Sequence, residues 1–292
     1  MAKRLLGKEV NEALVAALQT RAAALKEKGV TPTLAILRLG ENPSDLSYEK
    51  GATKRAEEIG VAIKNFILPE ASTKEEVLAV IDQINADASI HGCLMFRPLP
   101  KHLKGDQDEI CNRLDPKKDV DSMNHLSNAG VYEGRADLGY APCTPAACME
   151  ILDHYGIDCK GKKACIIGRS LVVGKPAAMM LMQKNATITI CHTRTVDPAA
   201  VCREADIIIS AAGVLNSLTK DFVREGQIVI DVSMNWNPEK ITTKGKGGMS
   251  GDAVFEDVEP IVEAITPVPG GVGAVTTSVL MKHVVEAAEA TL

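Results

Sequence analysis

Aromatic residues are scarce in this chain, which has one Trp, four Tyr and four Phe among 292 residues. Long apolar runs are missing as well, and a representative run, Asp206–Ala212, is far too short to span a bilayer. The chain has no basic block and a net charge of −5, so we expect neither nucleic acid nor a membrane as a partner. The first residues show no secretory signal pattern, which predicts a cytoplasmic protein.

The eight cysteines form no C-x-x-C pair, and several lie inside apolar runs. This usage favours reduced, buried thiols over disulfides or a zinc site, so we expect no metal. The cysteines are Cys93, Cys111, Cys143, Cys148, Cys159, Cys165, Cys191 and Cys202.

Helical and strand patterns alternate through the first part of the chain. Helical spacing of apolar residues covers 10–28 and 44–59, and a capping box at 72–75 predicts a third helix through about 86. Strand patterns lie between these helices, at 33–39, 61–68 and 92–96. Strands that alternate with helices of this length predict a parallel α/β sheet.

A long polar stretch from about 115 to 145 interrupts the pattern and suggests a functional segment or a domain connection. A helix near 145–156 then opens a second series, with strands at 163–167, 186–191, 206–210 and 227–232, helices between them, and a final helix at 275–290. We therefore expect two α/β domains flanking a cleft, the second of them a Rossmann-type parallel sheet. The expected domains are residues 1–142, completed by the C-terminal helix 274–292, and residues 143–273.

A glycine turn separates the strand ending at Ile167 from the helix that Gly174 and Pro176 open. Backbone N–H groups and a helix dipole in this geometry can hold a phosphate. The spacing is Gly-x-Ser-x-x-x-Gly rather than Gly-x-Gly-x-x-Gly, so the pattern alone is also compatible with a plain turn. The candidate cofactor residues here are Gly168, Arg169, Ser170, Val173 and Gly174.

The next strand ends in Thr193 and Arg194, where a dinucleotide fold selective for NAD usually has an acidic residue. A cationic, hydroxyl-rich end favours the 2′-phosphate of NADP over NAD. Arg169 or Arg194 alone could be a solvated loop charge, but both fall at predicted phosphate turns. His192 is more typical of a structural histidine, and we give it no catalytic role. Two further residues complete the edge where nicotinamide would lie, Gly213 and Met234.

Five motifs then occur together in one order, and they are Lys118-Asp-Val-Asp121, Pro142-Cys-Thr-Pro145, the Gly-Arg-Ser-x-x-Val-Gly-x-Pro turn, Gly251-Asp-Ala-Val-Phe255 and Pro267-Val-Pro-Gly-Gly-Val-Gly273. With them the chain resembles the methylenetetrahydrofolate dehydrogenase/cyclohydrolase family over essentially its whole length. The resemblance implies a homodimeric enzyme of one-carbon metabolism that binds folate in the cleft between its two domains. The family oxidises 5,10-methylenetetrahydrofolate to the 5,10-methenyl form with NAD(P), and then hydrolyses that to 10-formyltetrahydrofolate.

The resemblance also implies an active site built on Tyr-x-x-x-Lys, a Gln before Pro-Leu-Pro, and the second Asp of Asp-Val-Asp. Tyr48 and Asp121 match and are the implied catalytic residues, but the lysine position is Ala52 and the glutamine position is Phe96. Lys50 and Lys54 should face away from the site, about 200° around the helix from Ala52. All four positions should line the folate with the loop of Pro269, Gly270, Gly271, Val272 and Gly273, after which the family usually has proline where this chain has Ala274.

Alanine at position 52 and phenylalanine at position 96 should affect the hydrolysis more than the hydride transfer. Hydride removal gives a cation shared by two nitrogens and needs no proton transfer, whereas hydrolysis needs general acid–base work that alanine cannot do. We therefore expect an NADP-dependent dehydrogenase with weak or lost cyclohydrolase activity. The Asp121 carboxylate would accept two N–H groups of the pterin, although it could instead be a turn or cap carboxylate.

Three alternatives stay open at this point. Another group could restore hydrolysis and make the chain fully bifunctional. The chain could be a different two-domain NADP-dependent dehydrogenase, acting on a hydroxy or amino acid. It could also be a folate- or nucleotide-binding protein without catalysis.

Overall fold

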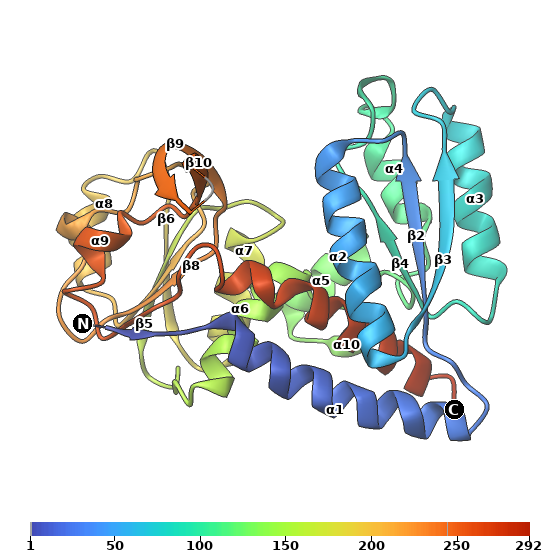
Figure 1. Ribbon diagram of the computed structural model, residues 1–292, viewed down its shortest axis with the longest axis horizontal. Coiled ribbons are helices and arrows are strands. Elements are labelled where there is room, and N and C mark those ends of the chain that lie inside the picture. The colour runs from blue at the N-terminus through green and yellow to red at the C-terminus, as the bar shows by residue number, and fades with distance from the viewer. Residues whose placement is uncertain (1, 244) are drawn as a thin grey trace. The chain divides into compact units, whose positions relative to one another are not determined.

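The computed structural model describes residues 2–243 and 245–292 (Figure 1). The chain forms two compact α/β units, which confirms the expected fold class. Residues 12–143 and 277–292 form the three-stranded unit, and residues 2–11 and 144–276 form the six-stranded unit. Residues 2–11 thus differ from their expected assignment, because a short strand at 3–4 pairs with the larger sheet.

The sheet of the three-stranded unit is parallel, with the order β3-β2-β4. Its strands are β2 (Thr33–Leu39), β3 (Ala62–Leu68) and β4 (Gly92–Met95). Every residue of the central strand β2 is buried, as expected of a parallel strand covered on both faces. The helices of this unit, which include most of the first and last helices of the chain, are α1 (Gly7–Glu27), α2 (Pro43–Ile59), α3 (Lys74–Ala86), α4 (Gln107–Arg113), α5 (His125–Glu133) and α10 (Thr276–Glu289).

Capping residues set the ends of α2 and α3. Asn42 accepts a hydrogen bond from the N–H of Ser44 at the start of α2, and Gly60 ends that helix in the left-handed conformation, with φ of 94°. The predicted capping box at 72–75 is wrong by one residue, since Thr73 and Glu76 make the reciprocal bonds. The sequence offers both registers, and only the backbone geometry selects between them.

The polar stretch from 115 to 145, in which the sequence shows no helix or strand pattern, is structured. The segment contains α5 and a short 3₁₀ turn at Ala136–Leu138. The buried residues of α5 are Ser127 and Gly130, so the helix has no apolar periodicity for a sequence pattern to detect. Its ends are nevertheless well defined, by an Asn124 cap and by Gly134 with φ of 73°.

The sheet of the six-stranded unit is parallel throughout, with the order β1-β11-β8-β7-β5-β6. The strands are β1 (Lys3–Arg4), β5 (Lys163–Ile167), β6 (Thr187–Cys191), β7 (Ile207–Ser210), β8 (Ile228–Asp231) and β11 (Ala264–Ile265). The helices are α6 (Cys143–His154), α7 (Gly174–Gln183), α8 (Pro198–Arg203) and α9 (Phe255–Val258). Because β6 lies on one side of β5 and β7 on the other, the carboxyl end of β5 is a topological switch point, where ligands bind in such sheets.

Two parts of this unit differ from expectation. Between β7 and β8 the chain makes only a short 3₁₀ turn, Lys220–Phe222, instead of a helix. After β8 it makes an antiparallel hairpin of β9 (Asn235–Thr242) and β10 (Gly245–Ser250), drawn in orange in Figure 1. Proline within β9 and three glycines within β10 hide these strands from a propensity argument. Among the described residues, no helix has the length and apolar character needed to cross a membrane.

Candidate functional site

Helix α2 presents Tyr48 and Ala52 one turn apart on the same face. The Tyr48 ring meets the ring of Phe96, just after β4, edge to face, with centroids 6.1 Å apart and planes at 85°. The Ala52 methyl group is fully buried, while Lys50 and Lys54 are exposed. The structure therefore brings Tyr48 and Phe96 together and leaves both lysines pointing away from Ala52.

A buried ion pair fixes α2 to the central strand beside Tyr48. Arg38 Nε on β2 lies 2.8 Å from Glu49 Oε2 on α2, and both side chains are largely excluded from solvent. Sequence reasoning missed this pair, and the signal for it was an arginine inside an otherwise apolar strand. The pair holds the helix that carries Tyr48 in place.

The segment that carries Asp121 is anchored by the two charged residues before it. Lys118 Nζ donates to the carbonyl oxygens of three residues at the end of α3, at 2.6 to 2.9 Å. Asp119 is fully buried and accepts from the N–H groups of Met123 and Asn124 and from the Ser127 hydroxyl. These two residues are therefore structural, and they leave Asp121 with a quarter of its side chain exposed.

Asp121 lies beside a cation that sequence reasoning did not single out. Arg97 Nη2 is 3.6 Å from Asp121 Oδ2, and the Cys143 N–H donates to Asp121 Oδ1 at 3.4 Å. Burial raises the pKa of the Asp121 carboxyl above its usual range, and the Arg97 charge opposes that shift. Arg97 directly follows Phe96 at the carboxyl end of β4, and that position was the available signal.

The last helix, α10, contributes a buried histidine next to this segment. His283 Nδ1 lies 2.9 Å from the Val120 carbonyl oxygen, and its ring lies 5.1 Å from that of Tyr140. Burial lowers the pKa of His283 to about 4, so the imidazole is neutral and its Nδ1–H donates to Val120. This bond ties the backbone before Asp121 to α10.

In the six-stranded unit, the predicted glycine turn follows β5 and is held by hydrogen bonds within the turn. Gly168 has φ of 125°, and a Cβ there would collide with the carbonyl oxygen of Ala211. The Ser170 hydroxyl accepts from the N–H groups of Val173, at 3.1 Å, and of Gly174, at 3.4 Å. The structure thus brings these four predicted residues into one turn, with the Arg169 side chain exposed on it.

The loop after β6 begins at the same edge of the sheet, because Ile167 and Cys191 are paired in register. The His192 N–H donates to Thr195 Oγ1 at 2.9 Å, and the Arg194 N–H donates to His192 Nδ1 at 3.1 Å. Through these two hydrogen bonds His192 stabilises the loop. Thr193 and Arg194 are exposed on it, as they must be to reach a phosphate.

A buried carboxylate that sequence reasoning left without a role organises the rest of this edge. Asp252 is fully buried and accepts from the N–H groups of Ala212, at 2.8 Å, and of Val214, at 2.9 Å. It accepts further hydrogen bonds from Ser210, Gly213, Ser233 and Asn235. Its backbone N–H donates to Asp231, whose pKa burial raises to about 6. The network holds both Gly213 and the segment that carries Met234.

The proline–glycine loop meets Met234 around a cavity of about 210 Å³. A Cβ on Gly273 would lie 3.1 Å from the Met234 sulfur, so the glycine allows a close approach of the two segments. The cavity is lined by Asp231, Val232, Met234 and residues 267–274, which include all five predicted loop residues.

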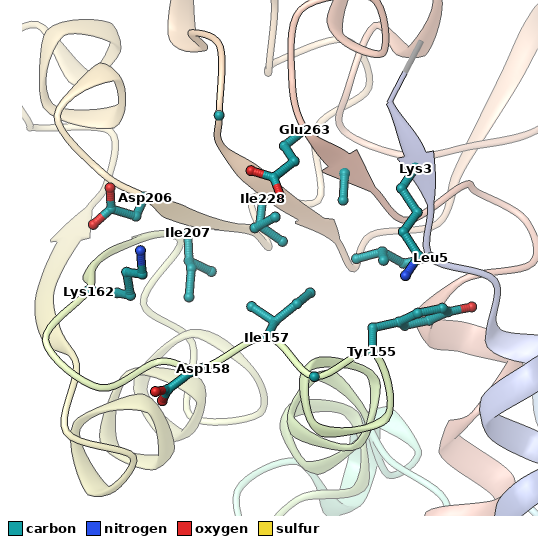
Figure 2. A pocket seen from close by; sticks show the side chains of 13 residues that line it. Lys3, Leu5, Tyr155, Ile157, Asp158, Lys162, Asp206, Ile207, Ile228 and Glu263 are labelled. Atoms are coloured by element: carbon teal, nitrogen blue, oxygen red, sulfur yellow. The ribbon is translucent and has the colours of Figure 1, made fainter.

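A second cavity, of about 300 Å³, lies at the opposite edge of the same sheet (Figure 2). Lys162 and Asp206 on its rim precede β5 and β7, and Tyr155 and Lys3 lie at its other end. It contains none of the predicted site residues. Ligands of parallel α/β sheets bind outside the carboxyl ends of the strands, which is the edge with the glycine turn and not the edge with this cavity.

Comparison with known families agrees with this geometry. Residues 5–121 match the model of the tetrahydrofolate dehydrogenase/cyclohydrolase catalytic domain, and residues 142–292 match that of its NAD(P)-binding domain. The chain belongs to the tetrahydrofolate dehydrogenase/cyclohydrolase family. The resemblance inferred from the motifs is thereby confirmed.

Individual members of the tetrahydrofolate dehydrogenase/cyclohydrolase family match over their full length. The bifunctional protein FolD of Carboxydothermus hydrogenoformans is 48% identical over 99% of this chain and 98% of its own. The crystal structure of FolD from Campylobacter jejuni superposes with a TM-score of 0.92 at 38% identity, covering 100% of both chains. The Trypanosoma brucei enzyme, solved with NADP and an inhibitor, has a TM-score of 0.91 at 28% identity and covers 99% of this chain and 98% of its own.

Proposed function

We propose that this chain catalyses the NADP-dependent oxidation of 5,10-methylenetetrahydrofolate to 5,10-methenyltetrahydrofolate, with weak or no cyclohydrolase activity. The observation that carries the cofactor assignment is the closed glycine turn at the switch point, with Arg169 exposed on it and Arg194 on the neighbouring loop. Two guanidinium groups and no carboxylate at these positions fit a 2′-phosphate better than a free ribose.

The folate assignment rests on Asp121 and Tyr48. Arg97 and the Cys143 N–H orient the Asp121 carboxylate, which would accept hydrogen bonds from the pterin. Tyr48 offers an aromatic face and a hydroxyl, and its helix is held by the Arg38–Glu49 pair. NADP, when bound, supplies the hydride acceptor. The residues of this chain then need only to hold the folate carbon in attack geometry, because hydride removal moves no proton.

The proposed weakness in hydrolysis rests on Ala52 and Phe96. Water must lose a proton as it attacks the methenyl carbon, and a ring nitrogen must gain one as it leaves. A buried methyl group and a phenyl ring can do neither. The absence of a positioned acid or base typically costs ~10²–10⁴-fold in rate.

A fully bifunctional enzyme is the second candidate, because the Carboxydothermus hydrogenoformans relative, at 48% identity, is named bifunctional. Hydrolysis would then need a proton-transfer group other than the residue at position 52.

We also propose that the three-stranded unit, residues 12–143 with 277–292, is the folate domain and that the six-stranded unit is the NADP domain. The proposed assembly is a homodimer in the cytoplasm. Sedimentation analysis of the purified protein tests the assembly, and a monomer would contradict it.

The experiment that tests the function is a steady-state assay of both reactions with NADP and with NAD. We expect methylenetetrahydrofolate-dependent reduction of NADP, with hydrolysis of the methenyl form much slower. Arg169→Ala and Arg194→Ala should each raise the KM for NADP by roughly 10- to 100-fold and leave that for NAD nearly unchanged, because each removes a bond to a charged group. Lys160→Ala, a distant exposed cation, is the control. No reduction of either cofactor would overturn the proposal and favour a binding protein.

A further inference from the structure

Three cysteines that are far apart in the sequence meet inside the six-stranded unit. Cys165 lies on β5, Cys191 ends β6, and Cys202 lies on α8. The Cys165 sulfur is 3.5 Å from that of Cys202 and 3.6 Å from that of Cys191, and all three sulfurs lie within 4.8 Å of one another. None of the three residues is more than 1% exposed.

We propose that these residues, here called the trithiol cluster, form a binding site for a thiophilic element that is coordinated by three sulfurs. In water, before it binds, this element exists as a neutral hydroxide. Trivalent arsenic is the simplest ion of this class. Around a metal with bonds to sulfur of about 2.3 Å, the sulfurs of a tetrahedral site lie about 3.8 Å apart. The spacing in the trithiol cluster is already close to that value, so an ion seated over the three sulfurs needs only small shifts of the side chains.

The surroundings of the trithiol cluster select against a charged complex. The cluster belongs to an apolar core that includes Ala205, Ile208 and Leu218. A divalent ion held by three thiolates would leave a negative charge in this core, which is costly to bury. Among the described His, Cys, Asp and Glu residues, none joins the three cysteines as a fourth ligand.

Trivalent arsenic avoids this charge. Arsenous acid, As(OH)₃, reacts with three thiols to form three As–S bonds while three As–O bonds break. Each hydroxide leaves with one thiol proton as water, so the arsenic keeps its oxidation state and the bound complex is neutral. Burial that disfavours a free thiolate therefore does not disfavour this product.

The position of the trithiol cluster links it to the nucleotide site, a consequence that rests on the proposed NADP function. β5 runs from Cys165 into the Gly168 turn within three residues, and Cys191 directly precedes the loop that carries Arg194. An ion that joins β5, β6 and α8 constrains both turns, so arsenic and NADP should change each other's affinity by the same factor. Entry needs only a local opening of α8, a helix of six residues whose other side chains are partly or fully exposed.

The test uses the reduced full-length protein, arsenite as the probe, and arsenic X-ray absorption with native mass spectrometry. We expect one arsenic per chain, coordinated by three sulfurs and no oxygen, with a mass gain of one arsenic less three hydrogens. Cys202→Ala should lose this coordination. Cys148→Ala, which removes a fully buried cysteine of α6 outside the trithiol cluster, should retain it.

Arsenic bound by fewer than three sulfurs in the native protein would overturn the proposal, and that measurement decides even if Cys202→Ala fails to fold. Equal coordination in Cys202→Ala, or zinc binding at the cluster more tightly than arsenite, would also overturn it. NADP binding is measured separately by titration. Failure of NADP to bind would contradict the proposed function and leave the arsenic result standing.

Discussion

Tyr48 and Phe96 meet edge to face, with ring centroids 6.1 Å apart, one helical turn from the buried methyl group of Ala52. Such an aromatic pair contributes ~0.5–1.5 kcal/mol beyond its buried area, so the contact stabilises the junction of α2 and β4. The side chains of Ala52 and Phe96 carry no group that can accept or donate a proton. Ala52 and Phe96 therefore contribute shape to this part of the site, and no acid–base chemistry.

Restoring polar groups at this corner should restore hydrolysis. In the double variant Ala52→Lys with Phe96→Gln, we expect the hydrolysis of methenyltetrahydrofolate to rise by ~10²–10⁴-fold, because burial at position 52 lowers a lysine pKa toward neutrality. The rate is followed by the loss of methenyl absorbance.

Lys50→Ala, which changes an exposed lysine on the same helix, is the matched control and should leave hydrolysis unchanged. Dehydrogenase activity in the double variant should stay within a few-fold of the native value. Rapid hydrolysis by the native protein, or no gain in the double variant, would refute the assignment of the two positions.

Replacing Asp121 should impair the use of folate and leave the binding of the cofactor nearly unchanged. Asp121→Ala should reduce turnover of methylenetetrahydrofolate by at least about 100-fold, through the loss of two charge-assisted hydrogen bonds, while NADP affinity stays nearly unchanged. Turnover assays and NADP titration by fluorescence measure the two effects. Equal loss of both would show that Asp121 is a structural carboxylate.

Replacing Arg97 should move the pH dependence of folate use. Burial raises the pKa of Asp121 and Arg97 opposes this, so in Arg97→Leu the carboxyl takes up its proton at a higher pH. The acidic limb of the kcat/KM profile should therefore shift to higher pH. Arg113→Leu, which breaks an exposed pair with Asp82, should leave the profile in place. A shift in both variants would indicate a general charge effect.

The Asp252 network should be essential for the stability of the six-stranded unit. In Asp252→Asn one acceptor oxygen becomes a donor and faces N–H groups and hydroxyls that also donate. We expect the free energy of unfolding to fall by about 1–3 kcal/mol, measured by chemical denaturation. Asp257→Asn, an exposed site on α9, should cost almost nothing. Similar losses in the two variants would argue against a special role for the network.

His283 should make the protein sensitive to acid. Its pKa is about 4 in the folded chain against an ordinary value of 6.5, so the unfolded chain binds a proton that the folded chain resists. The contribution of the neutral imidazole to stability is fully present above about pH 6.5 and is lost as the pH falls toward and below 4. The free energy of unfolding should fall by roughly 3 kcal/mol in all from this source.

His283→Asn keeps a donor for the Val120 carbonyl without the titration, so its free energy of unfolding should fall less steeply over this range. His125→Asn, at an exposed histidine, is the control and should keep the native slope. Parallel curves for the native protein and His283→Asn would exclude this source of acid sensitivity.

Local patterns in the sequence determined the alternation of strands and helices, the glycine turn at Gly168 and the family motifs. These features depend on neighbouring residues, because strand and helix periodicity and left-handed turns are properties of short segments. The departures at Ala52 and Phe96 were readable for the same reason, since each sits at a fixed distance from a motif. The capping box, by contrast, was misplaced by one residue because two registers satisfy the same pattern.

Only the tertiary structure decided which distant residues act together. Arg97 meets Asp121 across 24 positions of sequence, and His283 reaches Val120 from the last helix. Asp252 accepts hydrogen bonds from two separate segments, 210–214 and 233–235. The same holds for Cys165, Cys191 and Cys202, which look scattered in sequence but touch in the core. Parallel strands place residues from remote parts of the chain at the same level of a sheet, and no local pattern encodes that register.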